Sequence, residues 1–511
     1  MTIAPKILFL GLDAVSKDLI LPWCDDGLLP TFQSLRDTCM WGTTENAPGL
    51  YTGSVWPTLW TGLTVGRHGC YYYEQLRRGT YEIQEFLGDQ IRAEPFWTRL
   101  GRAGRRMVLF DVPKVGLCED VNGIQIADWG THEVDMDACS WPPDLMAEIH
   151  RRHGRSPLRR CDWVMDGRDP ERTLHRMLLS RVQTKVAIAE DLLGREPWDL
   201  FMTVFSEGHC AGHQLWHVRD TTHPRHDPAL AARMGDPIRD VYVALDKAIG
   251  RLLNAAGPET TVIVLMSHGM SVHNDATYLL DDILRRLEGE PAPLSRAVLD
   301  RTRRAWKKLP LWLTEAFRPV ARTVNQYPDV SDRSRRRCFA VPTNANCAGI
   351  RLNLAGREPA GLLHPGADSE EFCNRLIGDL YDLVDPASGR SLVREVVRSR
   401  DVFFGEHVDE LPDLLVRWHR DWAITGAASP RIGRLVREDD TTRRTGDHRP
   451  DGLFFLRGSD VVPGRVAMPV PTEDFAPTMA ALLHVDLPNV DGKPIPLARP
   501  CAAELTERRP S

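Results

Sequence analysis

The 511-residue sequence contains no apolar run near the roughly 18 to 20 residues that a membrane-spanning helix needs. It also has no excess of positive charge, because 64 Lys and Arg residues stand against 70 Asp and Glu residues, a formal net charge of −6. This balance gives no electrostatic reason to expect a nucleic acid polymer or an anionic membrane surface as a partner. An anionic ligand must therefore be attracted locally, by a metal ion or by a few placed cations.

A disulfide framework is not expected either, because the 11 cysteines are odd in number and follow no regular spacing. A reducing compartment fits this composition better, so we expect a cytoplasmic protein. The apolar run from Ile7 to Leu12 is too short for the hydrophobic region of a signal peptide and leads directly into Asp13. We predict that this run is the first buried strand of a sheet.

Short apolar runs alternate with helical patterns through the first half of the chain. The predicted strands are 7–12, 106–111, 200–205 and 261–266. The predicted helices between them are 95–103, 171–193 and 241–256. Such alternation is typical of βαβ units, so we predict an α/β fold in which helices cover both faces of a mostly parallel sheet. Ligands of such sheets bind beyond the carboxyl ends of the strands.

The length and the changes in composition predict more than one domain. A catalytic core is expected to combine residues 1–285 with residues 441–511. Residues 286–345 are basic and rich in Trp and Arg, and they are predicted to form a helical insert. Its basic face is either simply solvated or part of a lid that brings Arg or Lys over an anionic substrate. Residues 346–440 contain short strand-like runs around one helical stretch and are predicted to form a small α+β subdomain.

Acidic and hydroxyl side chains follow the first predicted strand. Asp13 stands directly after this strand, where a carboxylate faces the ligand crevice, although an Asp there is more often a helix N-cap. The stretch 51–69 contains several hydroxyls, including Thr52 and Ser54, and from Pro57 onward it can open a helix whose N-terminus favours anions. A hydroxyl nucleophile is weak at its free pKa and needs a metal or a base to ionise it.

Three histidines within nine residues follow the strand predicted at 200–205. His209 and His213 are four residues apart, so a helix would place both imidazoles on one face, as two ligands of one metal ion require. His217 continues the series, and Glu207 is nearby. This local concentration of histidine predicts a metal site.

Further imidazoles occur at a strand end and in a loop. Ser267 and His268 follow the strand predicted at 261–266, and His448 lies in the Gly- and Pro-punctuated segment 445–452. A lone loop histidine usually belongs to the surface. Taken with the other segments, however, these residues place acid, hydroxyl and imidazole groups just after predicted strands or in tight loops, and this predicts one common site.

Taken in order, these segments resemble the alkaline phosphatase superfamily, in particular its type I phosphodiesterase/nucleotide pyrophosphatase branch. The resemblance covers most of the chain. It rests on the first-strand Asp13, the TG-x3-GRHG element, PFWTRLGRAGRRMVLFDVP, the histidine pair, SHGM, GDHRPDG and the closing PTEDFAPTMAALLHVDLPNVDGKPI. The resemblance implies a three-layer α/β/α core that carries a hydrolase site with two metal ions, usually zinc.

The resemblance also implies roles for individual residues. The family nucleophile stands ten residues before the glycine of the TG pair, which is Thr52 here, and Ser54 is the alternative if the loop shifts by two residues. Asp13 and His268 would share one metal with the nucleophile. The other metal would be held by two histidines, His213 and His448.

The chain departs from the family pattern at two ligand positions. The usual Asp-x3-His is His209-x3-His213, and the usual Asp-His-Gly is Ser267-His268-Gly269. Both changes remove an anionic ligand. Three imidazoles still make a sound zinc site, whereas Ser267 is at best a weak neutral ligand. We therefore expect one tightly bound Zn²⁺ and a second ion, Zn²⁺ or Mn²⁺, that binds more weakly or only with substrate.

The implied function is metal-dependent hydrolysis of a phosphodiester or pyrophosphate bond in a small molecule, through a covalent phospho-threonine. Arg449, beside His448, is the expected phosphate contact. A phosphoryl or nucleotidyl transferase acting on a specialised metabolite stays open, as does a metal-binding homologue with impaired catalysis. A sulfatase is not favoured, because the nucleophile segment contains neither C-x-P-x-R nor S-x-P-x-R. The oligomeric state stays open, a homodimer included.

Overall fold

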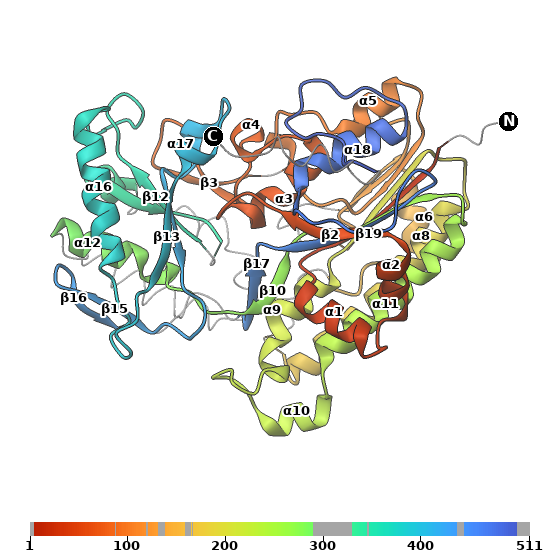
Figure 1. The fold of residues 1–511 in the computed structure, drawn as a ribbon, viewed down its shortest axis with the longest axis horizontal. Coiled ribbons are helices and arrows are strands. Elements are labelled where there is room, and N and C mark those ends of the chain that lie inside the picture. Colours follow the sequence, from red (N-terminus) through yellow and green to blue (C-terminus); the bar gives the residue numbers. More distant parts are fainter. Residues whose placement is uncertain are drawn as a thin grey trace. The chain divides into compact units, whose positions relative to one another are not determined.

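The computed structural model describes residues 5–86, 88–118, 121–130, 138–158, 165, 167–289, 330–344, 347–436 and 444–497 (Figure 1). The chain divides into two compact units. The first comprises Met1–Thr64, Leu87–Val272 and Arg444–Ser511, and the second comprises Val65–Phe86 and His273–Arg443. The second unit thus also contains residues 65–86 and 273–285, which the sequence assigns to the core. The predicted insert, residues 286–345, lies mostly outside the described residues.

The described part of the first unit contains a ten-stranded sheet in the order β19-β2-β18-β9-β1-β8-β5-β6-β7, with β20 paired to β2. These strands are β1 (Ile7–Leu12), β2 (Met40–Glu45), β5 (Met107–Phe110), β6 (Gly123–Ala127), β7 (Cys139–Trp141), β8 (Leu200–Phe205), β9 (Thr261–Met266), β18 (Gly452–Arg457), β19 (Gly464–Arg465) and β20 (Val470–Pro471). The central run from β9 to β6 is parallel, whereas β18 and β7 pair with it in antiparallel fashion. The predicted α/β fold with a mostly parallel sheet is confirmed.

Helices cover both faces of this sheet, which explains why its central strands are almost entirely apolar (Figure 1). The helices on one face include α2 (Pro30–Thr38), α8 (Pro170–Leu193) and α11 (Pro237–Ala256). The other face carries α5 (Phe96–Arg102) and α18 (Phe475–Leu482). On β18, Phe455 stacks on Phe32 of α2, and the next ring, Phe454, packs edge-on against Phe475 of α18. The alternating side chains of one strand therefore tie the two helical layers to the sheet.

The second unit contains an antiparallel four-stranded sheet in the order β11-β12-β14-β13. Its strands are β11 (Cys338–Val341), β12 (Cys347–Leu352), β13 (Val393–Arg398) and β14 (Leu414–Trp418). Helices α12 (Leu280–Glu288) and α16 (Ala367–Tyr381) share its apolar core. The described part of this unit is therefore α+β.

Two features of the described ranges bear on the expectations from composition. Every cysteine within the described ranges is a free thiol. None of the helices in these ranges combines the length and the apolar character that crossing a membrane requires.

Candidate metal and nucleophile site

The carboxyl ends of β1 and β9 bring Asp13 and Ser267 together. The strands are parallel with Leu12 opposite Met266, so the next residue of each strand emerges at the same edge of the sheet. Ser267 Oγ donates a hydrogen bond to Asp13 Oδ1 over 3.1 Å, and Trp56 Nε1 donates to the same oxygen over 3.0 Å. One oxygen of the Asp13 carboxylate is therefore held in place by two donors.

Helix α9 (Glu207–Arg219) begins just beyond the end of β8 and positions two imidazoles. As their four-residue spacing predicts, His209 and His213 lie on one side of the helix, and their ring centroids are 4.5 Å apart. His213 is fully buried, and His209 is 8% exposed. The helix thus presents both rings to the same interior point.

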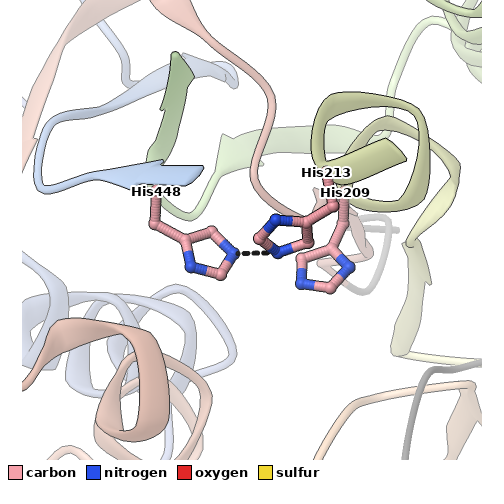
Figure 2. A group of neighbouring side chains, drawn as sticks. All are labelled: His209, His213 and His448. Carbon is pink, nitrogen blue, oxygen red and sulfur yellow. Dashed lines mark hydrogen bonds between the residues drawn. The ribbon is translucent and has the colours of Figure 1, made fainter. Parts of the chain in front are cut away.

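A third imidazole reaches this point from a strand. His448 lies on β17 (Gly446–Arg449), which pairs with β10 (Gly269–Val272) so that His448 stands opposite Met270. The sequence analysis predicts a loop here, but the residue is held by a sheet ladder. Figure 2 shows the three rings converging, with His213 Nε2 only 3.1 Å from His448 Nε2.

The spacing of these nitrogens fits one metal ion. One ring nitrogen from each of His209, His213 and His448 lies within 4.8 Å of the others. Two nitrogen ligands of one tetrahedral zinc ion are about 3.3 Å apart, close to the separation between His213 and His448. His213 Nδ1 lies 2.7 Å from the carbonyl oxygen of Gly446, which can only accept. Nδ1 therefore holds the ring proton, and Nε2 presents a lone pair to the other rings, an arrangement typical of histidine ligands.

A fourth imidazole, His268, borders this group of three. Its ring centroid is 4.6 Å from that of His448, and its Nε2 is buried without a hydrogen-bond partner among the described residues. Its Nδ1 lies 3.0 Å from Ser267 Oγ. A buried ring nitrogen without a partner is costly in the protein alone but suits a metal ligand.

Burial keeps two of these imidazoles neutral. It lowers the pKa of His268 to about 4, although the Asp13 carboxylate works in the opposite direction. Burial and the neighbouring His213 and His268 hold the pKa of His448 well below its usual 6.5. Neutral imidazole is the form that binds metal, so these residues are ready to act as ligands at neutral pH.

Of the two predicted nucleophiles, Thr52 is the one that contacts the imidazole group. Helix α3 (Tyr51–Thr61) begins well before Pro57, where the sequence predicts a helix start, so Thr52 lies in its first turn. The Thr52 hydroxyl lies 3.5 Å from His448 Nδ1. The Ser54 hydroxyl is buried in the helix and has no hydrogen-bond partner in the described chain. Amides in the first turn of a helix can also bind an anion at Thr52.

The geometry does not favour Arg449 as the phosphate contact. Neighbouring residues of a strand point to opposite faces, so Arg449 faces away from the side on which His448 lies. Its Nε donates to Ser271 Oγ over 2.7 Å. A different arginine, Arg444, lies beside the imidazoles, with Nη1 3.3 Å from His213 Nε2. Sequence reasoning does not identify Arg444, because its place depends on the packing of β17 against α9.

The first turn of α9 is anchored by an ion pair that the sequence does not reveal. Glu207 accepts a hydrogen bond from Arg181 of α8 over 2.7 Å, and the two side chains are 0% and 1% exposed. Arg181 also donates to Ser206 Oγ over 3.2 Å. This buried pair fixes the start of the helix that carries His209 and His213.

The third histidine of the series, His217, has a separate environment. Its Nδ1 lies 3.3 Å from Thr445 Oγ1, and its Nε2 lies 3.6 Å from Glu171. It lines a cavity of about 580 Å³ together with Arg225 and Arg233. Burial lowers the pKa of His217 to about 4, and the nearby Arg225 adds to this effect.

Comparisons with known proteins agree with this architecture. Residues 7–451 match the family described as type I phosphodiesterase/nucleotide pyrophosphatase. Similar solved structures include murine ectonucleotide pyrophosphatase/phosphodiesterase 5, in an inactive form with AMP, at 13% identity and TM-score 0.52 over 96% of this chain and 97% of that chain. Phosphonoacetate hydrolase from Sinorhizobium meliloti, with phosphonoformate, gives 13% identity and TM-score 0.52 over 94% and 95%. No curated protein sequence gives a match.

The solved structures are so distant in sequence that they establish the fold alone. The family match is stronger, because it spans nearly the whole chain, from β1 through the segment that contains His448. The chain therefore belongs to the type I phosphodiesterase/nucleotide pyrophosphatase family, and it is a hydrolase.

Proposed function

We propose that this hydrolase uses metal ions and the nucleophile Thr52 to cleave a phosphodiester or pyrophosphate bond in a small-molecule phosphate ester. The observation that carries the proposal is the convergence of His209, His213 and His448, with the Thr52 hydroxyl 3.5 Å from the third ring. In a homologue with impaired catalysis, no reaction would require a hydroxyl nucleophile beside three buried imidazoles.

The residues present suit two metal ions of unequal affinity. His209, His213 and His448 would hold a tightly bound Zn²⁺. Asp13 and His268, with Thr52, would hold a second Zn²⁺ or Mn²⁺. Asp13 is the single carboxylate of this second set, and one of its oxygens also accepts hydrogen bonds from Trp56 and Ser267, so we expect the second ion to bind more weakly. When bound, the ions supply Lewis acidity that ionises a hydroxyl and stabilises phosphoryl oxygens.

The chain's own groups then perform a two-step displacement. Thr52 Oγ gives up its proton to solvent and forms a bond to phosphorus as the bond to the leaving oxygen breaks, which gives phospho-threonine. The leaving oxygen departs with the bonding electron pair and takes up a proton from solvent. The amides at the start of α3 stabilise the non-bridging oxygens. In the second step water attacks phosphorus, the bond to Thr52 Oγ breaks, and the threonine takes back a proton.

Transfer to an alcohol instead of water would use the same covalent species. A lid that excludes water would favour transfer. The predicted insert, residues 286–345, which is either a solvated segment or such a lid, falls mostly outside the described residues. Hydrolysis is the function that the family match favours.

The proposal is tested by nitrophenol release from bis-p-nitrophenyl phosphate. Purified protein with added Zn²⁺ or Mn²⁺ should turn over this diester, a chelator should abolish turnover, and restored metal should recover it. Full activity after exhaustive chelation would rule out the proposed metal dependence. No activity toward diester and pyrophosphate substrates in fully loaded protein would favour the impaired homologue.

A further inference from the structure

The backbone at Arg444 is tied to the helix that carries two of the imidazoles. The amide of the next residue, Thr445, donates to the carbonyl oxygen of His213 over 2.7 Å. The Thr445 hydroxyl donates to the same oxygen over 3.2 Å, and Thr445 is fully buried. The backbone of Arg444 is therefore held at a fixed point beside α9.

The guanidinium of Arg444 lies next to a ring nitrogen of the candidate metal site. Its Nη1 lies 3.3 Å from His213 Nε2, the same atom that lies 3.1 Å from His448 Nε2. Arginine is always charged and only donates, so it cannot be a metal ligand.

A metal ion held by His213 and His448 would therefore have a second cation within a few ångströms. Two positive charges so close repel each other strongly in a buried site. An anion with several oxygens relieves this repulsion, because one oxygen can face the metal ion while another accepts from the guanidinium. A phosphoryl group has this shape and charge.

We propose that Arg444 binds a non-bridging oxygen of the substrate phosphoryl group and makes the site select for phosphoryl charge. This inference rests on the proposed function, since it assigns a substrate contact at the same site. Attraction by a guanidinium grows with the charge of the anion, so among the substrates of the proposed function Arg444 favours a pyrophosphate with a terminal, dianionic phosphoryl group over a monoanionic diester. Arg449, bonded to Ser271 on the opposite face of β17, does not fill this role.

Phosphate binding tests the contact without turnover. The zinc-loaded Thr52→Ala protein is titrated with inorganic phosphate by calorimetry, alone and combined with Arg444→Lys or Arg444→Ala. Loss of a charge-assisted hydrogen bond should weaken phosphate binding by roughly tenfold to a hundredfold in the Ala variant and by less in the Lys variant. Zinc content and the urea midpoint should stay unchanged, which separates loss of the contact from misfolding.

The outcomes distinguish this inference from the proposed function. Equal phosphate affinity with and without Arg444, at equal zinc content, would overturn the inference and leave the proposed function standing. Failure of the Thr52→Ala protein to bind zinc or any phosphate would overturn the proposed function itself. A loss from Arg449→Ala that exceeds the loss from Arg444→Ala would assign the contact to Arg449.

Charge selection has its own readout in protein that retains Thr52. The ratio of kcat/KM for p-nitrophenyl phosphate, a dianion, to that for bis-p-nitrophenyl phosphate, a monoanion, should fall in Arg444→Ala. Equal losses on both substrates would show that Arg444 does not select for charge.

Discussion

The Nε2 atoms of His213 and His448 lie 3.1 Å apart, although 235 positions separate the two residues in the sequence. One belongs to a helix that follows the central strand β8, and the other belongs to the short strand β17 at the start of the last segment of the first unit. The carbonyl oxygen of Gly446, also on β17, accepts from His213 Nδ1 over 2.7 Å and fixes the orientation of the ring. Strand and helix therefore set the geometry of these two imidazoles jointly.

The Thr52 assignment predicts different results for two neighbouring hydroxyls. Thr52→Ala should lower kcat by at least about a thousandfold while zinc content stays the same, because the nucleophile is lost and the imidazoles are not. Ser54→Ala should keep most of the activity, since its hydroxyl is buried within α3 and is not at the imidazole group. Both are measured as nitrophenol release at saturating metal. Retained activity in Thr52→Ala and loss in Ser54→Ala would move the role to Ser54.

The unequal ligand sets predict unequal metal retention. After dialysis against metal-free buffer, elemental analysis should find about one equivalent of zinc per chain, held by the three imidazoles. Addition of phosphate should raise the content toward two, because an anion offsets the charge of the weaker ion. Two equivalents retained without phosphate would contradict the idea of one tight and one weak site.

The buried ion pair at the start of α9 predicts a large loss of stability from a small chemical change. Glu207→Gln keeps the side-chain shape but leaves the buried Arg181 without an opposite charge beside it, which should cost about 3 to 5 kcal/mol in urea unfolding. The matched control is Glu190→Gln, which breaks a partly exposed pair with Arg251 and should cost less than about 1 kcal/mol. Similar losses from the two variants would show that the buried pair contributes no more to the free energy of unfolding than the partly exposed pair.

The partly buried carboxyl group of Glu473 leads us to expect that stability varies with pH. Burial raises the pKa of Glu473 to about 7, and the nearby Asp474 and Asp491 carboxylates add to this effect. Below its ordinary pKa of 4.5 the group is protonated in both the folded and the unfolded chain. Between about pH 4.5 and 7 only the folded chain keeps the proton. The free energy of unfolding therefore falls as the pH rises through this range.

Replacement of this carboxyl by an amide should remove that pH dependence. Glu473→Gln should be more stable than the unchanged protein at pH 8, by about 1 to 2 kcal/mol after allowance for partial exposure, and equally stable at pH 4. Urea unfolding at the two pH values measures the difference. If Glu473→Gln does not raise the free energy of unfolding at pH 8, the folded state does not raise the pKa of this carboxyl.

The sequence predicts the centre of the sheet well and its periphery poorly. The strands predicted at 7–12, 200–205 and 261–266 coincide with β1, β8 and β9, because strands covered on both faces are continuous apolar runs with clear ends. Strand β2 was not predicted, since its MWGTTE segment is only partly buried and has no such run. The short strands β10 and β17 have no local signal, because each depends on a partner far away in the sequence.

Site residues whose positions follow from local structure can be identified from the sequence, whereas those placed by long-range contacts cannot. The spacing of His209 and His213 is a local property of a helix, and the structure shows the expected shared side. Asp13 and Ser267 could be paired because parallel strands end at one edge of the sheet. Arg444 could not be found, because its position comes from hydrogen bonds between Thr445 and α9.

The central claim is that three imidazoles hold a metal ion beside Thr52, and anomalous X-ray scattering tests it most directly. Crystals of the protein with added zinc and vanadate are measured on both sides of the zinc absorption edge. The account predicts a strong zinc peak bonded to His209, His213 and His448, with vanadium next to the Thr52 hydroxyl. A fully occupied zinc ion elsewhere, with none among these three rings, would contradict it.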